Sequence, residues 1–155
     1  DVKKLLLALT FYSIDEINEI IKTHNENPSK FYAQKKLAHA IVKDIHGEAE
    51  AKKCEEISTK LFSEEITTID KEDLYNALLG VPSIEVENEI NVIDLLVELK
   101  ISTSKSNARN LITSKSVSIN SQPITEFSFV AKKSDSINNK FSYLKKGKKN
   151  FFLIK

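Results

Sequence analysis

The sequence predicts two small domains: an all-α helical domain, then an α+β domain in which two helices pack on a small, mainly antiparallel sheet. Apolar residues recur at helical spacing over the first 62 residues, whereas residues 117–154 contain short alternating runs typical of strands. The charge also changes sign, because residues 1–99 carry 11 basic and 20 acidic side chains and residues 100–155 carry 12 basic and 2 acidic. We therefore expect a helical domain over 1–80, a linker over 81–90 and an α+β domain over 91–155.

Local signals place the first helices. Ser13-x-x-Glu16 forms a capping box before isoleucines at helical spacing, and Asn25–Ser29 breaks that pattern. A further helix is expected from about Phe31 to Ile45, with Gly47 ending it. The apolar residues expected on one side of this helix are Leu37, Ile41, Val42 and Ile45.

The rest of the first domain is predicted from charge and proline. Glu48–Phe62 is expected to be a helix, and its acidic start suits the positive end of the helix dipole. Asp70-x-x-Asp73 caps a short helix that Gly80 and Pro82 end, because proline cannot continue the hydrogen-bond ladder.

The second domain begins with two capped helices. Asn91 caps a short helix over Val92–Leu99, and Ser104 caps a second helix that runs to about Thr113. Beyond them, Asn120–Pro123 is a turn between short strands, and Gly147 allows a hairpin turn within Lys145–Asn150. The domain therefore ends in strands.

Composition limits the classes of protein. Cys54 is the single cysteine, so no internal disulfide can form, and no apolar run is long enough to span a bilayer. No secretory signal is present at the start, which favours a cytoplasmic protein without membrane partners. Methionine is absent, and we therefore expect Asp1 to lie inside a longer polypeptide.

The segment Ser104–Ile112, followed by Val117-Ser118-Ile119-Asn120, resembles the RNA-binding domain named after ribosomal protein S-four. The resemblance implies that the second helix presents serine, lysine and arginine side chains to phosphates. A helix N-terminus exposes unpaired amides and a positive dipole end, so Ser104, Lys105 and Ser106 suit a phosphate. Ser121 stands where this family usually has glycine, and Asn120 can itself adopt the left-handed conformation that the turn needs.

Two basic features are candidate RNA-binding sites. Arg109 is the only arginine beside 22 lysines, and its guanidinium group can bind phosphate through two parallel hydrogen bonds. The second feature is the basic run Lys145, Lys146, Lys148 and Lys149, which Asn150 follows. This run alone is typical of a solvated hairpin tip, but together with Arg109 it predicts one cationic side that tracks a nucleic-acid backbone.

The broader pattern is similar to bacterial-type tyrosyl-tRNA synthetases over essentially the whole chain. The segments that carry the similarity are Asp1–Ile17, Ala33–Ala38, Ile45–Glu48, Leu61–Ser63, Gly80–Pro82, Arg109 and Lys146–Asn150. The resemblance implies a helical anticodon-binding region followed by the S-four-like domain. Its function would be to position tyrosine tRNA by the anticodon stem and the long variable arm.

The same resemblance implies a homodimeric parent enzyme that uses ATP and Mg²⁺ to join tyrosine to tRNA. The HIGH-like and KMSKS-like signatures of its catalytic domain are absent from this sequence, so we expect no catalytic residue and no cofactor site here. An acidic residue at the head of the first helix is expected to touch the anticodon, and Asp1 is the matching candidate. Phe151 is a possible stacking surface for a base, although its place in the strand Phe151–Ile154 favours the core.

Other constellations point to structure rather than chemistry. His39 and His46 have no set of neighbours with familiar metal-ligand spacing, so structural or capping roles are expected and no metal site is. Cys54 has no identified base partner. Two rival functions stay open: another RNA-associated protein with the same module, such as a pseudouridine synthase or a ribosome-associated factor, and an assembly domain with incidental charge.

Overall fold

The computed structural model describes all 155 residues, which form two compact units, Asp1–Thr59 and Lys60–Lys155. The predicted class is confirmed, because a helical part precedes a mixed region with a five-stranded and a two-stranded sheet. Residues 60–80, which the sequence pattern assigned to the helical domain, belong to the second unit.

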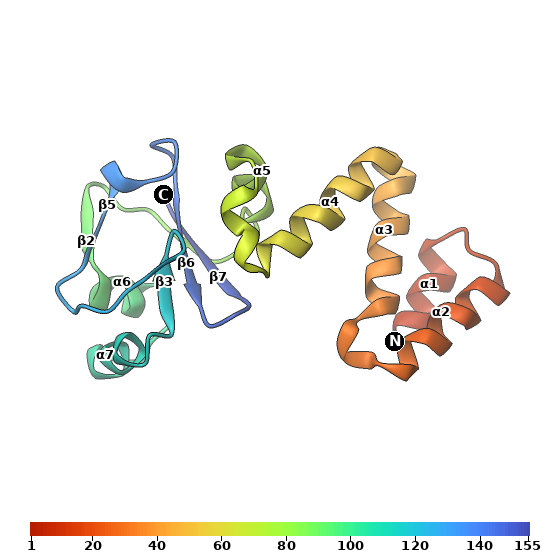
Figure 1. Cartoon of the computed structure of the whole chain (residues 1–155), viewed down its shortest axis with the longest axis horizontal. Helices are drawn as coiled ribbons and strands as arrows, with labels where there is room; N and C mark the ends of the chain where they lie inside the picture. Colours follow the sequence, from red (N-terminus) through yellow and green to blue (C-terminus); the bar gives the residue numbers. More distant parts are fainter. The chain divides into compact units, whose positions relative to one another are not determined.

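The first unit is a small helical bundle (Figure 1). Its elements are α1 (Val2–Leu9), α2 (Ile14–Glu26), the 3-10 turn η1 (Pro28–Lys30), α3 (Tyr32–His46) and most of α4 (Glu48–Leu61). Helices α1, α2 and α3 pack on one another around Leu6, Ile17, Ile20 and Ala33. Ile45, expected on the apolar side of α3, is instead 69% exposed.

The predicted helix ends of this unit are confirmed. Ser13 and Glu16 form the reciprocal capping box, in which the Glu16 carboxylate accepts the Ser13 backbone N–H at 2.7 Å. The hydrogen bond from the Ser13 backbone N–H is the main cause that holds the pKa of Glu16 below its ordinary value, and the hydrogen bond from the Ser13 hydroxyl adds to it. Gly47 ends α3 with φ of 91°, a conformation that side chains rarely adopt.

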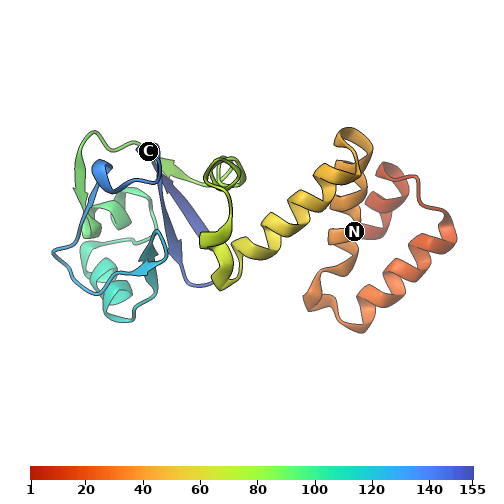
Figure 2. The same cartoon turned by 45° about the horizontal axis from the view of Figure 1, so that its top comes forward.

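The second unit places helices on both faces of a sheet. Its helical elements are η2 (Glu64–Thr68), α5 (Lys71–Ala77), α6 (Val92–Glu98), α7 (Lys105–Thr113) and η3 (Lys133–Asp135). Its strands are β1 (Ser83–Ile84), β2 (Glu89–Asn91), β3 (Val117–Ile119), β4 (Gln122–Pro123), β5 (Val130–Lys132), β6 (Ser142–Lys146) and β7 (Asn150–Ile154). The larger sheet has the order β1-β7-β6-β3-β4, antiparallel except for β1 with β7, and β2 pairs with β5. In Figures 1 and 2 the blue β6–β7 hairpin is its longest part.

One face of the larger sheet packs against α6 and α7. Ile119, Leu144 and Ile154 share an apolar core with residues of these helices, including Leu95 and Ile112. Because side chains alternate along a strand, Ser142 and Lys146 lie on the same face of β6 as Leu144.

The opposite face is covered by residues 61–80. The Phe62 ring meets the Phe151 ring edge-on at 5.9 Å between centroids, and Tyr75 of α5 lies 5.1 Å from Phe141. Leu78 is completely buried. These contacts explain physically why residues 60–80 fold with the sheet.

Candidate nucleic-acid interface

The N-terminus of α7 forms as predicted. Ser104 is the N-cap, and its hydroxyl accepts the backbone N–H of Asn107 at 3.2 Å. The next amides, those of Lys105 and Ser106, lie in the first turn, where a helix has no intrahelical acceptors. This end of α7 is exposed and carries the dipole's positive charge.

The Lys105 side chain at this end of α7 forms an ion pair. Its ammonium nitrogen lies 2.6 Å from a carboxylate oxygen of Asp94 on α6. The expected phosphate ligand is therefore paired with an anion, which partly cancels its charge.

Arg109 lies one turn further along the exposed side of α7. Ala108 and Ile112 point into the core, so Arg109 shares the outer flank with Lys105, four residues earlier. The guanidinium group makes no ion pair within the protein. It is thus available to a ligand.

The tip of the β6–β7 hairpin is fastened next to both ends of α7. The Lys146 ammonium donates to the carbonyl of Ile101 at 3.3 Å, just before the helix. The backbone N–H of Gly147 donates to the carbonyl of Ser116 at 2.8 Å, just after it. Gly147 has φ of 62°, which supplies the predicted turn. The structure therefore brings α7 and the basic tip into one region, with Lys148, Lys149 and Asn150 exposed.

Lys145 is separated from this region. Neighbouring residues of a strand point to opposite faces, and Lys145 is paired across the hairpin with Phe151. Its ammonium nitrogen sits over the Phe151 ring, 5.3 Å from the centroid. The prediction of a single cationic side is therefore wrong for Lys145, which lies on the face opposite α6 and α7.

Phe151 is a core residue, as its strand position favoured. It is only 6% exposed and contacts Phe62 and, at 6.3 Å, Tyr143. Its ring has no open face for a nucleobase.

Asp1 belongs to the first unit and is exposed. It is the N-cap of α1 without a side-chain cap hydrogen bond, and its carboxylate lies 3.8 Å from the ammonium of Lys4. Asp1 is therefore accessible, with only a loose ionic contact.

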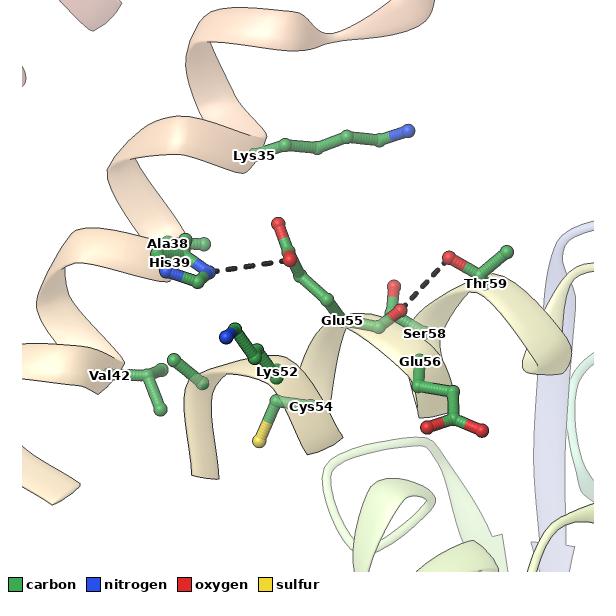
Figure 3. Close-up of a pocket in the computed structure, with 11 residues that line it drawn as sticks. Lys35, Ala38, His39, Val42, Lys52, Cys54, Glu55, Glu56, Ser58 and Thr59 are labelled. Carbon is green, nitrogen blue, oxygen red and sulfur yellow. Dashed lines mark hydrogen bonds and ion pairs between the residues drawn. The ribbon is translucent and has the colours of Figure 1, made fainter. Parts of the chain in front are cut away.

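A cleft of about 490 Å³ lies between α3 and α4 in the first unit. Figure 3 shows His39 of α3 facing Glu55 of α4, with Cys54 on the α4 side. His39 Nε2 is 3.6 Å from Glu48, and Nδ1 is 3.3 Å from Glu55, although Nδ1 makes no well-aligned hydrogen bond. His39 thus joins the two helices, a structural role that agrees with expectation.

A shorter ion pair also joins α3 and α4. Lys43 lies 3.0 Å from Glu48, and their hydrogen bond raises the pKa of Lys43 and lowers the pKa of Glu48. The pair is exposed, so its stabilising effect is small.

No group of three or more metal-ligating side chains is close enough to hold a metal ion.

The sequence did not reveal the role of Asn120 beyond its turn. Asn120 and Ser121 both have positive φ, 48° and 69°. The Asn120 carboxamide accepts the Tyr143 N–H at 3.1 Å and donates to Ser142 at 3.1 Å. Ser121 and Tyr143 share a 2.7 Å hydrogen bond between their hydroxyl groups, and burial raises the pKa of Tyr143. The available signal was the Val-x-Ile-Asn motif before the turn.

No helix is long and apolar enough to cross a membrane. Residues 73–154 match the family described as the tyrosine–tRNA ligase SYY-like C-terminal domain. The chain is 41% identical to the tyrosine–tRNA ligase of Ureaplasma urealyticum, covering 99% of this chain and 37% of that protein. It is 40% identical to that of Mycoplasmopsis synoviae, over 100% of this chain and 38% of the relative, and 35% identical to that of Oceanobacillus iheyensis, over 99% and 36%.

The chain thus spans little more than a third of the length of these curated relatives. The match to the C-terminal domain covers more than half of the 155 residues, and it includes α7 and the β6–β7 hairpin. On this evidence the chain belongs to the tyrosine–tRNA ligase family and represents its C-terminal region.

Proposed function

We propose that this chain binds tyrosine tRNA and positions it for aminoacylation by the catalytic part of a longer tyrosine–tRNA ligase. The observation that carries the proposal is the fastening of the hairpin tip to both sides of α7, by Lys146 to Ile101 and by Gly147 to Ser116. These contacts support the proposal because they join the tip that carries Lys148 and Lys149 to the residues that flank α7, the helix that carries Arg109. A group of cations on one rigid module suits a polyphosphate backbone.

Each part of the region has a chemical role in this proposal. Arg109 binds a phosphate through two parallel N–H donors, and the amides of Lys105 and Ser106 with the Ser104 hydroxyl receive a second phosphate. Lys148 and Lys149 add charge at the tip, and Asn150 can donate to sugar or phosphate oxygens. RNA helices present phosphates and a shallow minor groove, so such a surface reads shape and position.

The finer RNA contacts follow from the family resemblance. The second unit binds the anticodon stem and the long variable arm, and Asp1 on the first unit accepts hydrogen bonds from an anticodon base. The parent enzyme joins tyrosine to tRNA in the cytoplasm as a homodimer. ATP and Mg²⁺ bind to its catalytic part, and we assign no cofactor or metal to this chain.

An exposed apolar surface on the first unit supports a larger parent. Leu5, Leu9, Phe11 and Ile14 lie in or beside α1 and are 46%, 53%, 94% and 69% exposed. Exposed apolar groups so close together are typical of an interface. We propose that the catalytic part covers them, since the relatives are nearly three times as long as this chain.

A salt titration of tRNA binding tests the function. We expect the chain to bind tyrosine tRNA with strong salt dependence, and Arg109→Ala to weaken binding roughly tenfold at low salt. The slope of log K against log salt should also decrease by roughly 0.9, because one phosphate contact is lost. Lys71→Ala is the matched control, since it removes an exposed charge on α5, across the sheet from α7.

The competing functions give different results. A general RNA-binding module would bind a tRNA with a short variable arm as tightly as tyrosine tRNA. An assembly domain would bind neither tRNA, even at low salt. Equal effects of Arg109→Ala and Lys71→Ala would contradict the proposed binding face.

A further inference from the structure

A second recess in the RNA-binding unit has the chemistry of a base-binding site. It is a cavity of about 310 Å³ between the β3–β4 hairpin and the segment of β5 and η3. Its apolar wall is formed by Ile119 and Ala131, which are buried, and by the half-buried Phe129. Its polar lining comes from Asn120, Gln122, Lys132, Asp135 and Ser142.

Ser142 supplies a buried donor to this cavity. The residue is only 6% exposed, and its hydroxyl oxygen accepts a hydrogen bond from the Asn120 amide. The orientation of that amide is fixed, because its oxygen accepts the Tyr143 N–H. The Ser142 hydroxyl donates to no group of the protein, which is costly for a buried donor unless a ligand accepts it.

The rim offers both kinds of hydrogen-bonding group. Gln122 is exposed and makes no side-chain hydrogen bond within the protein, so its amide can donate and accept. The Asp135 carboxylate accepts one hydrogen bond from Ser134, at 3.1 Å, and retains further acceptor capacity. Lys132 is exposed and has no ion pair, so it can meet an anion beside the cavity.

We propose that this cavity receives one unpaired nucleobase of the bound RNA. The base packs against Phe129 and the apolar wall, its edges bond to Ser142 and Gln122, and Lys132 holds the adjoining phosphate. A flat apolar body with donor and acceptor edges and a neighbouring negative charge matches this lining. The inference rests on the proposed function in taking RNA as the ligand.

The cavity lies within reach of the proposed phosphate-binding region. Ser142 and Lys146 project from the same face of β6 and are four residues apart, which corresponds to roughly 13 Å along a strand. This short separation places the cavity and the hairpin tip within the span of one RNA ligand. The contacts with the base itself depend on hydrogen bonding and packing, so the loss of Gln122 should leave the salt slope unchanged, unlike the loss of a phosphate-binding cation such as Arg109.

Nuclear magnetic resonance on the full chain tests the site directly. AMP, GMP, CMP and UMP are titrated separately, with inorganic phosphate as the control. We expect at least one nucleotide to shift the amide signals of Asn120, Ala131 and Ser142 in a saturable manner, and phosphate to leave them unchanged. If no nucleotide shifts these signals, or if phosphate shifts them equally, the proposal is overturned.

Binding of two matched RNAs tests the site within a larger ligand. One RNA is a fully paired duplex, and the other has the same duplex with a single unpaired nucleotide. Gln122→Ala should weaken binding of the second RNA by roughly three- to tenfold, the value of one hydrogen bond, and leave the duplex and the salt slope unchanged. Gln34→Ala, an exposed glutamine on α3, is its control.

A lysine pair provides a second comparison. Lys132 lines the cavity, whereas Lys133 follows it directly in the chain and does not. Both variants remove one positive charge, and they differ in whether that charge lies at the cavity. Only Lys132→Ala should therefore reduce the preference for the unpaired nucleotide. Identical effects of the two variants on both RNAs would contradict the site.

The outcomes separate this inference from the proposed function. If Arg109→Ala weakens both RNAs and Gln122→Ala weakens neither, the cavity is not a base site and the phosphate-binding face stands. If Gln122→Ala acts and Arg109→Ala does not, the base site stands and the proposed phosphate-binding face fails.

Discussion

The ammonium group of Lys105 lies 2.6 Å from a carboxylate oxygen of Asp94, so the first turn of α7 is joined to α6. The side chains are 63% and 44% exposed, and such a pair adds at most about 1 kcal/mol to stability. Its larger consequence is electrostatic, because Asp94 reduces the attraction of Lys105 for phosphate.

Asp94→Asn should therefore strengthen RNA binding. Releasing Lys105 is expected to raise affinity at low salt by roughly two- to fivefold, the equivalent of about 0.5–1 kcal/mol. The salt slope should steepen if Lys105 then neutralises a phosphate. Titrations of tyrosine tRNA at several salt concentrations measure both quantities.

Glu98→Gln is the matched control for that variant, because it also removes one negative charge from α6 and Glu98 has no ion pair. In the Lys105→Ala background, Asp94→Asn should give no more gain than Glu98→Gln. An equal gain in both backgrounds would show that net charge, rather than the release of Lys105, determines affinity.

The helix ends were predictable from the sequence because their signals are local. Ser13, Asp70, Asn91 and Ser104 each cap a helix at the predicted position, and in each case the side chain accepts a backbone N–H within three residues. Strands β2 and β5 were not predicted. They pair Glu89–Asn91 with Val130–Lys132, and short strands that far apart in the chain have no local signature.

The site was predictable only in part, for two different reasons. The separation of Lys145 from Lys146 follows from strand alternation, so the sequence already contained the signal once the strand extends to Lys146. The pairing of Lys105 with Asp94 is a tertiary contact between two helices, and the spacing of the two residues in the sequence does not predict it. The cavity beside Ser142 depends likewise on how β5 folds back against β3 and β6.

Fragments of the chain test where the second unit begins. We expect residues 60–155 to fold alone, whereas residues 81–155 lose the cover of Phe141 and Phe151. The shorter fragment also lacks Leu74 and Leu78, which are 4% and 0% exposed. Each such loss costs about 2–5 kcal/mol, against a total domain stability of about 5–15 kcal/mol. The longer fragment should give a dispersed nuclear magnetic resonance spectrum and a cooperative melt. The same melting temperature for both fragments would place the boundary after residue 80.

The Asn120–Ser121 turn allows a test of backbone strain against a hydrogen bond. Ser121→Gly relieves a positive φ of 69°, but it removes the hydroxyl bonded to Tyr143. These effects are each about 1 kcal/mol and opposite in sign, so the free energy of unfolding should change little. In the Tyr143→Phe background no such bond remains, and Ser121→Gly should stabilise by about 1 kcal/mol. Denaturant unfolding of the four proteins measures the difference, and equal effects in both backgrounds would contradict a contribution from the Ser121 hydroxyl.

The capping box predicts how the stability of the first unit depends on pH. The Ser13 N–H and hydroxyl hold the pKa of Glu16 below its ordinary value, so the ionised carboxylate stabilises the folded state. That contribution is present above the unfolded pKa of about 4.3 and is lost as the pH falls through the lower folded pKa. Glu16→Gln should reduce stability at pH 7 and flatten its decline between roughly pH 5 and pH 2.

Ser13→Ala should cost about 1 kcal/mol at pH 7 and flatten the same decline, because the pKa of Glu16 then returns toward its unfolded value. Asp15→Asn, which removes a neighbouring carboxylate that accepts no hydrogen bond, is the control, and a pH profile altered as much by Asp15→Asn as by Glu16→Gln would exclude the capping box as the cause.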